Sequence, residues 1–304
     1  MKRFKTIGEF HQFRQLPPPE HPLISVTKID LVKRTVGTAS MTWCYDFYCI
    51  GLKRVSFSHS INFRYGQQPY DFNEGILSFV APNQVMSLSI DTQQETTQSG
   101  WLLLIHPDFL WNTSLAKSIR KYDFWDYSVH ESLFLSAKEE TILIHLFENI
   151  QQEYHANIDR FSKQIIISQM ESLLSYADRF YHRQFITREK ANHQLLEKLE
   201  ALLEDYFSNG ELAAKGLPTV QYISATLNVS PNYLRGLLKV LTGLNTQQLI
   251  HDKLIEKAKE KLSVTNISIS EIAYALGFEH PQSFTKLFKN KTNLSPLAYR
   301  QSLS

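Results

Sequence analysis

The chain has 304 residues, of which 43% are hydrophobic and 20% are charged, and its formal net charge is +2. This length exceeds one ordinary domain and suits two domains, each with its own core. No apolar run reaches roughly 18 residues, the length that a membrane-spanning helix needs. Residues 1–10 also lack the apolar core of a signal peptide. We therefore expect a cytoplasmic protein with no attachment to a membrane.

The two cysteines, Cys44 and Cys49, follow no spacing that is typical of a metal site or a redox pair. Their separation places them on opposite faces if the segment is a strand, so a local disulfide is disfavoured. We expect buried thiols in a reducing compartment, and neither a structural zinc nor any other cofactor.

In the N-terminal half, the residue pattern from Leu23 to about Leu104 predicts β structure. Short segments rich in Val, Ile, Phe, Tyr and Trp are separated by turn residues such as Gly66, Pro69 and Gly75. This pattern of short strands and turns predicts a small β-barrel or jelly roll. Because helices are expected to follow, the whole chain is expected to belong to the α+β class.

Two helices are expected to follow the strands, at residues 141–154 and 161–180, because apolar residues recur there at intervals of three and four. The apolar stripe of the second helix is wide enough to pack on the barrel or to meet a second copy of the chain. Its members are Ile165, Ile166, Met170, Leu173, Leu174 and Ala177. The polar segment 183–194 is expected to link this domain, residues 1–182, to a helical domain at residues 195–304.

Charge is distributed unevenly along the chain. Residues 1–195 carry 20 basic and 20 acidic side chains, whereas residues 218–304 carry ten basic and five acidic side chains. The last 25 residues contain Lys286, Lys289, Lys291 and Arg300 and no acidic residue. Such a local excess suits phosphate binding, although a basic helix face is also common on ordinary protein surfaces.

The helical half contains a diverged internal repeat. One set of matches has an offset of 49 residues, and the matches from residue 234 onward have an offset of 50. Each copy predicts a short helix, a tight turn and a second helix, with one turn longer by a residue. The matched pairs are Ile223 and Ile272, Leu227 and Leu276, Asn228 and Gly277, Leu234 and Phe284, Leu238 and Phe288, Lys239 and Lys289, and Thr242 and Thr292.

Local signals support these helices. Ser268 and Glu271 are spaced as a capping box at the start of one helix. Ser230, which precedes a first-turn proline, supplies an N-cap for another. Asn228 and Gly277 lie at equivalent turn positions, and both residue types tolerate the left-handed backbone that a tight turn needs.

The second helix of each copy is predicted to have an inward apolar face and an outward polar face. The outward residues are Asn232, Arg235, Gly236 and Lys239 in the first copy, and Gln282, Thr285, Lys286 and Lys289 in the second. Polar and basic side chains of this kind can bind base edges and phosphates in a major groove. The alternative is an ordinary solvent-exposed face, which the recurrence in two copies disfavours.

These features resemble the AraC/XylS family of transcription regulators over residues 195–304. The resemblance is carried by the run Ala-Leu-Gly-Phe-Glu-His-Pro-Gln-Ser-Phe-Thr-Lys-Leu-Phe-Lys at residues 275–289, followed by Leu294, Ser295, Pro296, Tyr299 and Arg300. It implies two recognition helices that enter adjacent major-groove segments on one face of the DNA. Carried over by position, the base-reading candidates are Asn232, Arg235 and Gly236, then Pro281, Gln282, Ser283, Thr285 and Lys286.

Some positions depart from the family pattern. Gly236 stands where family members often have a longer polar residue, so the first helix is expected to read fewer bases. Asn293 replaces the usual Gly before the Ser-Pro turn, and Asn also visits the left-handed region. Lys289 and Lys291 are expected to contact phosphates without reading the sequence.

The same resemblance implies that residues 1–182 form a cupin-like domain that senses a small ligand and helps the protein to dimerise. Trp43, Tyr45, Phe57 and His59 are the candidates for contacting this ligand, and each is also a candidate for the core. The implied partners are double-stranded DNA, RNA polymerase, a small-molecule effector and a second copy of the chain. Activation is the more common role in this family.

Two alternative functions are kept. One is a regulator that is controlled only by its abundance, and the other is a cupin enzyme with an accessory DNA-binding domain. A metal-dependent cupin would need a cluster such as His-x-His with a distant Glu and a third His. His59 has no histidine two residues away, so no enzymatic activity is expected.

Overall fold

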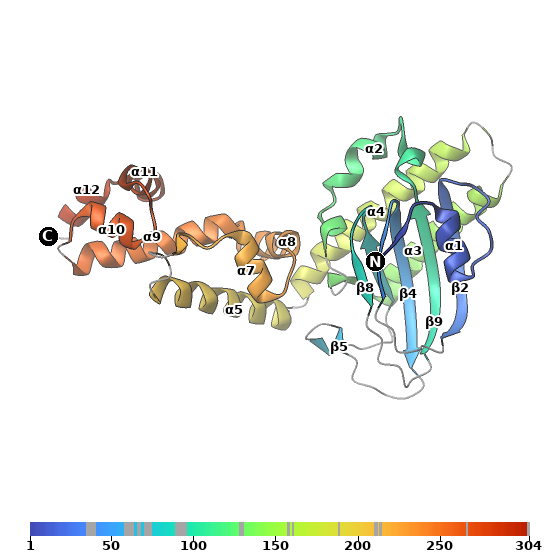
Figure 1. The fold of residues 1–304 in the computed structure, drawn as a ribbon, viewed down its shortest axis with the longest axis horizontal. Coiled ribbons are helices and arrows are strands. Elements are labelled where there is room, and N and C mark those ends of the chain that lie inside the picture. The colour runs from blue at the N-terminus through green and yellow to red at the C-terminus, as the bar shows by residue number, and fades with distance from the viewer. Residues whose placement is uncertain are drawn as a thin grey trace. The chain divides into compact units, whose positions relative to one another are not determined.

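The computed structural model describes residues 1–34, 41–57, 64–65, 68–69, 75–88, 96–127, 131–156, 159, 161–187, 189–209, 212, 215–265 and 267–302. The chain divides into two compact units, Met1–Gln184 and Phe185–Ser304. Figure 1 shows that the described strands all lie in the first unit, whereas the described part of the second unit is helical. The chain is therefore a mixed α+β protein.

The N-terminal unit contains a five-stranded sheet with the strand order β10, β7, β4, β9, β2. All neighbouring strands in it are antiparallel. Cys49 of β4 packs on one side of the sheet, whereas Ile50 and Leu52 are buried on the other, because successive side chains of a strand alternate. The strands are β2 (Ile24–Arg34), β4 (Tyr48–Phe57), β7 (Ile76–Val80), β9 (Thr96–Ile105) and β10 (Leu133–Phe134).

A second sheet has three strands, β1 (Lys2–Phe4), β3 (Met41–Tyr45) and β8 (Met86–Leu88). The start of the chain adds helix α1 (Ile7–Arg14), and β5 (Arg64–Tyr65) pairs with β6 (Gln68–Pro69). A hydrophobic cluster joins β1 and α1 to the five-stranded sheet: Phe4, Ile7, Phe10, Tyr45, Phe47, Cys49, Val80, Leu102 and Leu104. Closure of these sheets into a jelly roll stays a prediction.

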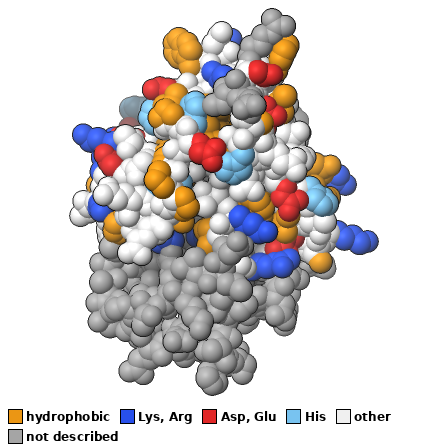
Figure 2. All heavy atoms as spheres, turned by 90° about the vertical axis from the view of Figure 1, so that its right-hand side faces the viewer, with side chains coloured by type: hydrophobic (Ala, Val, Ile, Leu, Met, Phe, Trp, Pro, Cys, Tyr) orange, Lys and Arg blue, Asp and Glu red, His pale blue; other side chains and the backbone are white. Residues whose placement is uncertain are grey.

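The other side of the five-stranded sheet is covered by helices. α3 (Ala137–His155) contacts β2 and β9, and Phe147 of α3 stacks on Trp101 with 5.9 Å between ring centroids. Short helices described after β9 include η1 (Pro107–Leu110), α2 (Ser114–Ser118), η2 (Ile119–Lys121) and η3 (Asp123–Asp126). Figure 2 shows the N-terminal unit from the side, where acidic, histidine and hydrophobic side chains lie interspersed on the described part.

The apolar stripe of helix α4 (Ser162–Thr187) was expected either to pack on the barrel or to meet a second copy of the chain. The burial of its residues decides between these two interpretations. Ile166, Met170, Leu173, Leu174 and Ala177 are buried, and only Ile165 of the stripe is exposed. The stripe therefore packs in the core of its own chain, which leaves it unable to serve as a dimer interface.

The C-terminal unit has one hydrophobic cluster to which several of its helices contribute, including α5 (Glu189–Ser208) and α9 (Thr246–Val264). Figure 1 shows α9 running from the α7 and α8 pair to the group formed by α10, α11 and α12. These helices are α7 (Val220–Leu227), α8 (Pro231–Thr242), α10 (Ile269–Ala275), α11 (Pro281–Thr292) and α12 (Pro296–Gln301).

The described residues of the predicted linker, 183–194, belong to the end of α4 and the start of α5. The role of this segment as a linker stays a prediction. Cys44 and Cys49 are buried free thiols, as predicted. None of the helices in the described ranges is both long and apolar enough to span a bilayer.

Candidate nucleic-acid interface

The first helix-turn-helix unit consists of α7, a turn and α8. α7 ends at Asn228, which has a left-handed backbone with φ of 55°. α8 begins with Ser230 as its N-cap, where the side-chain Oγ accepts a hydrogen bond from the backbone N–H of Tyr233 at 3.1 Å. The predicted turn residue and the predicted N-cap of this unit are therefore confirmed.

The second unit consists of α10, a turn and α11. The predicted capping box is present: Ser268 Oγ accepts from the N–H of Glu271 at 3.1 Å, and Glu271 Oε2 accepts from the N–H of Ser268 at 2.7 Å. These hydrogen bonds lower the pKa of the Glu271 carboxyl group. Gly277 in the turn has φ of 78°, and a Cβ at this position would lie 2.5 Å from the backbone oxygen of Leu212.

The two units also end alike. α8 ends at Gly243 and α11 ends at Asn293, with φ of 73° and 63° respectively. The N–H of Gly243 donates to the carbonyl of Lys239 at 3.2 Å, and the N–H of Asn293 donates to the carbonyl of Lys289 at 2.8 Å. Asn293 is thus accommodated where the family pattern has Gly, because Asn tolerates this backbone region.

The second helices have the two predicted faces. Leu234, Leu237 and Leu238 of α8 are buried, as are Phe284 and Phe288 of α11. On the opposite faces, Arg235, Lys239, Gln282, Ser283, Lys286 and Lys289 are exposed, while Asn232, Gly236, Pro281 and Thr285 are half-buried. Both helices therefore present polar and basic side chains to solvent.

Thr285 and Lys291 of α11 have partners that the sequence did not indicate. Thr285 Oγ1 donates to the carbonyl of Pro281 at 3.0 Å, so its hydroxyl hydrogen serves the helix and only its lone pairs and methyl group face outward. Lys291 Nζ forms an ion pair with Asp252 Oδ1 of α9 at 2.6 Å. The charge of Lys291 is therefore partly compensated within the protein, and its contact with phosphate stays a prediction.

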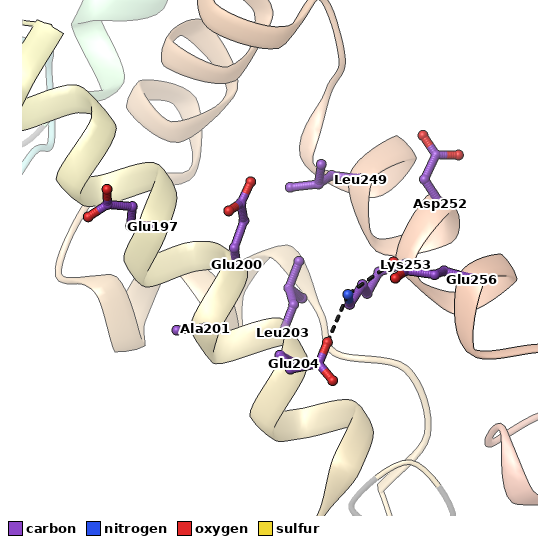
Figure 3. A pocket seen from close by; sticks show the side chains of 9 residues that line it. All are labelled: Glu197, Glu200, Ala201, Leu203, Glu204, Leu249, Asp252, Lys253 and Glu256. Atoms are coloured by element: carbon purple, nitrogen blue, oxygen red, sulfur yellow. Dashed lines mark hydrogen bonds and ion pairs between the residues drawn. The ribbon is translucent and has the colours of Figure 1, made fainter. Parts of the chain in front are cut away.

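A groove of about 580 Å³ lies between α5 and α9 (Figure 3). Five acidic side chains line it, which disfavours phosphate binding there: Glu197, Glu200, Glu204, Asp252 and Glu256. Glu204 of α5 pairs with Lys253 and Lys257 of α9, at 2.8 and 2.7 Å. Hydrogen bonds from both ammonium groups lower the pKa of Glu204 to about 2. This groove contains no residue of the two second helices.

The candidates for ligand contact in the N-terminal unit divide into two groups. Trp43 Nε1 donates to Tyr45 Oη at 2.6 Å, and both residues pack in the hydrophobic cluster of this unit. Burial raises the pKa of Tyr45 above its ordinary value. Phe57 belongs to β4, but its side chain and all of His59 lie outside the described residues. Within the described ranges, no three His, Cys, Asp or Glu side chains are grouped to hold a metal ion.

The helix-turn-helix domain family matches residues 223–302, which include most of both units. The raffinose operon transcriptional regulatory protein RafR of Pediococcus pentosaceus is 34% identical over 85 residues, or 28% of this chain and 31% of RafR. The C-terminal unit contains an AraC-type helix-turn-helix domain. The family resemblance found in the sequence is thereby confirmed for this part of the chain.

Other proteins are similar to part of the chain at comparable identity. Histidine kinase P4 of Formosa agariphila is 30% identical over 119 residues, which are 39% of this chain and 8% of the kinase. The solved C-terminal domain of AraT, a response regulator from Geobacillus stearothermophilus, is 29% identical, with a TM-score of 0.32, over 36% of this chain and 84% of that domain. The chain spans less than a third of the length of RafR and of the kinase.

Proposed function

We propose that the chain is a sequence-specific regulator of transcription that binds double-stranded DNA through α8 and α11. The observation that supports this most is the pair of equivalent second helices, each with a buried apolar face and an exposed polar or basic face. One such helix would be an ordinary amphipathic helix. Two in a tandem AraC-type domain fit adjacent segments of a major groove.

Each candidate side chain has a distinct proposed role. Arg235 and Gln282 read bases, because Arg suits guanine and Gln suits adenine in the major groove. Lys239 and Lys289 bind phosphates. The remaining base-reading candidates are Asn232, Gly236, Pro281, Ser283, Thr285 and Lys286.

The remainder of the proposal concerns the rest of the chain. Residues 1–182 act as a cupin-like sensor of a small effector, residues 183–194 connect the two parts, and residues 195–304 bind DNA. RNA polymerase is the proposed partner on the promoter, and activation is the proposed direction. A second copy of the chain, if it binds, uses a surface other than the buried stripe of α4.

A binding selection from random duplex DNA tests this function. The full chain, and a fragment from about Leu195 to Ser304, should each select a site with two non-identical submotifs about one turn, or ~34 Å, apart. Sedimentation should show one fragment on each site. A palindromic site that requires two fragments would contradict the tandem arrangement, and the absence of any sequence preference would contradict the function.

A further inference from the structure

A cavity of about 340 Å³ lies in the N-terminal unit, at one end of the five-stranded sheet. It is bordered by the segment before β2, by η1, by the end of α3 and by the start of α4. Its volume falls within the range of small-ligand pockets. The lining residues are Glu20, His21, Leu23, Ile24, Asp108, Phe109, Glu153, Tyr154, Ala156, Asp159, Ser162, Lys163 and Ile166.

The floor of the cavity is apolar and aromatic. Ile24, Phe109, Tyr154 and Ile166 have at most 7% of their surface exposed. The ring of His21 meets that of Phe109 edge to face, with 5.7 Å between centroids. His21 Nδ1 accepts a hydrogen bond from the N–H of Leu23 at 3.1 Å, and burial lowers the pKa of His21. The imidazole is therefore neutral at neutral pH, and the floor suits an uncharged, flat or branched hydrocarbon group.

The rim of the cavity is acidic. Among the described residues that line it, four carry carboxylates, Glu20, Asp108, Glu153 and Asp159, and one, Lys163, carries an ammonium group. The Lys163 ammonium donates to the carbonyl of Trp111 at 2.9 Å and lies 5.7 Å from the ring centroid of Phe109. The described part of the rim is therefore rich in negative charge, and Lys163 already has partners.

The four carboxylates differ in the hydrogen bonds and ion pairs that they already make within the protein. Asp159 Oδ1 accepts from the N–H groups of Phe161 and Ser162, at 2.7 and 3.0 Å, and so caps the start of α4. Glu20 Oε1 lies 2.7 Å from His155 Nδ1, and Asp108 Oδ2 lies 3.4 Å from His106 Nδ1. For Glu153, the described part of the chain shows no side-chain hydrogen bond or ion pair. Glu153 is therefore the carboxylate best able to receive a ligand.

We propose that this cavity binds a small organic cation, with its apolar body on the aromatic floor and its protonated amine at Glu153. An anionic ligand would face four carboxylates and displace Lys163 from its present contacts. Binding itself does not depend on the proposed regulatory function, but the ligand would supply the class of effector that this function leaves open.

Calorimetry on the full chain with three probes of similar shape tests the proposal. The probes are 2-phenylethylamine as the cation, 2-phenylethanol as the neutral compound and 3-phenylpropionate as the anion. The amine should bind at one per chain and raise the melting temperature, and the other two should bind at least about tenfold more weakly, since a charge-assisted hydrogen bond is lost. Equal binding of all three probes, or binding of none, would overturn the proposal.

Three variants locate the site. Glu153→Gln should weaken amine binding roughly 5- to 20-fold, whereas Glu148→Gln, the same change elsewhere on α3, should leave it unchanged. Ala156→Trp, at an exposed position on the rim, should block the cavity while the circular dichroism spectrum stays that of the original protein. Amine binding that survives Ala156→Trp would place the ligand elsewhere. DNA binding without amine, measured on the same variants, separates this proposal from the regulatory function.

Discussion

Gly277 and Gly243 share a left-handed backbone but differ in their surroundings. A Cβ on Gly277 would lie 2.5 Å from the Leu212 carbonyl oxygen, whereas a Cβ on Gly243 would meet no atom within 4 Å. Gly243→Ala should therefore cost only the backbone strain, about 1–2 kcal/mol of unfolding free energy. Gly277→Ala adds a steric clash with backbone and should cost about 3 kcal/mol or more. Urea denaturation of the two variants compares them, and equal losses would contradict this account.

The two recognition helices carry different side chains at their exposed positions, so each should control a different part of the DNA site. Arg235→Ala should relax base preference in one submotif only, by roughly 1–3 kcal/mol if Arg235 makes a bidentate contact with guanine. Gln282→Ala should relax preference in the other submotif. A binding selection repeated with each variant measures this. Loss of preference in both submotifs from one variant would mean that the helices do not read DNA independently.

Lys289 and Lys291 are near neighbours on α11, but only Lys291 is paired with Asp252. Lys289→Ala should weaken binding to specific and random DNA by similar factors and reduce the magnitude of the salt slope by roughly one. Lys291→Ala should reduce that slope less, because Asp252 already offsets its charge. Titrations at several salt concentrations give the slopes. A larger effect at Lys291 would show that the ion pair opens when DNA binds.

These residues also show what a single sequence reveals. The Ser268 and Glu271 capping box and the Ser230 cap could be predicted because each depends on residues three apart on one helix. The Lys291 and Asp252 pair joins residues 39 positions apart. No local pattern indicates such a pair, because it depends on how α9 and α11 pack.

At the scale of elements, Glu204 ties α5 to α9 through Lys253 and Lys257, and this contact should make stability depend on pH. The pKa of Glu204 falls from 4.5 to about 2 on folding. A lowered folded-state pKa contributes stability that is present above the unfolded value and is lost as the pH falls from 4.5 toward 2. Glu204→Gln should therefore destabilise the chain at pH 7 and have a smaller effect at pH 3.

Urea denaturation of the original chain and of Glu204→Gln at both pH values provides the measurement. Glu197→Gln, in the same groove but without an ion pair in the described structure, is the matched control. Added salt should also reduce the effect of Glu204→Gln at pH 7, because these side chains are partly exposed. An effect that is the same at pH 7 and pH 3 would rule out the ion pairs as its cause.

The elements that the sequence missed are those that depend on distant partners. β1 has three residues and pairs in parallel with β3, some 40 residues later, so periodicity cannot reveal it. The segment 183–194 contains no Gly or Pro to end a helix, and its described residues belong to α4 and α5. The amphipathic helices α8, α9 and α11 were predictable because their apolar residues recur at helical spacing.

At the scale of the whole molecule, the sequence predicted β structure followed by helices but not the strand order or the acidic cavity. Glu20, Phe109 and Glu153 meet in that cavity although they come from three distant parts of the chain. No local sequence pattern marks any of these three residues as part of a binding site. The C-terminal interface was easier to predict, since each recognition face lies on a single helix and the repeat supplies a second example.

Helix α9 also has a consequence for promoter architecture. It has 19 residues, about 28 Å at 1.5 Å for each residue, and it contacts α8 as well as α10, α11 and α12. A continuous helix of this kind keeps the two helix-turn-helix units at a fixed separation. We therefore expect that the protein cannot adjust these units to promoters in which the two submotifs are spaced differently. Inserting five base pairs between the submotifs, about half a turn, would turn the second to the opposite side of the duplex. Electrophoretic mobility shifts on such spaced sites should show affinity falling to that of a single submotif, and the genomic targets of this chain should then share one fixed spacing.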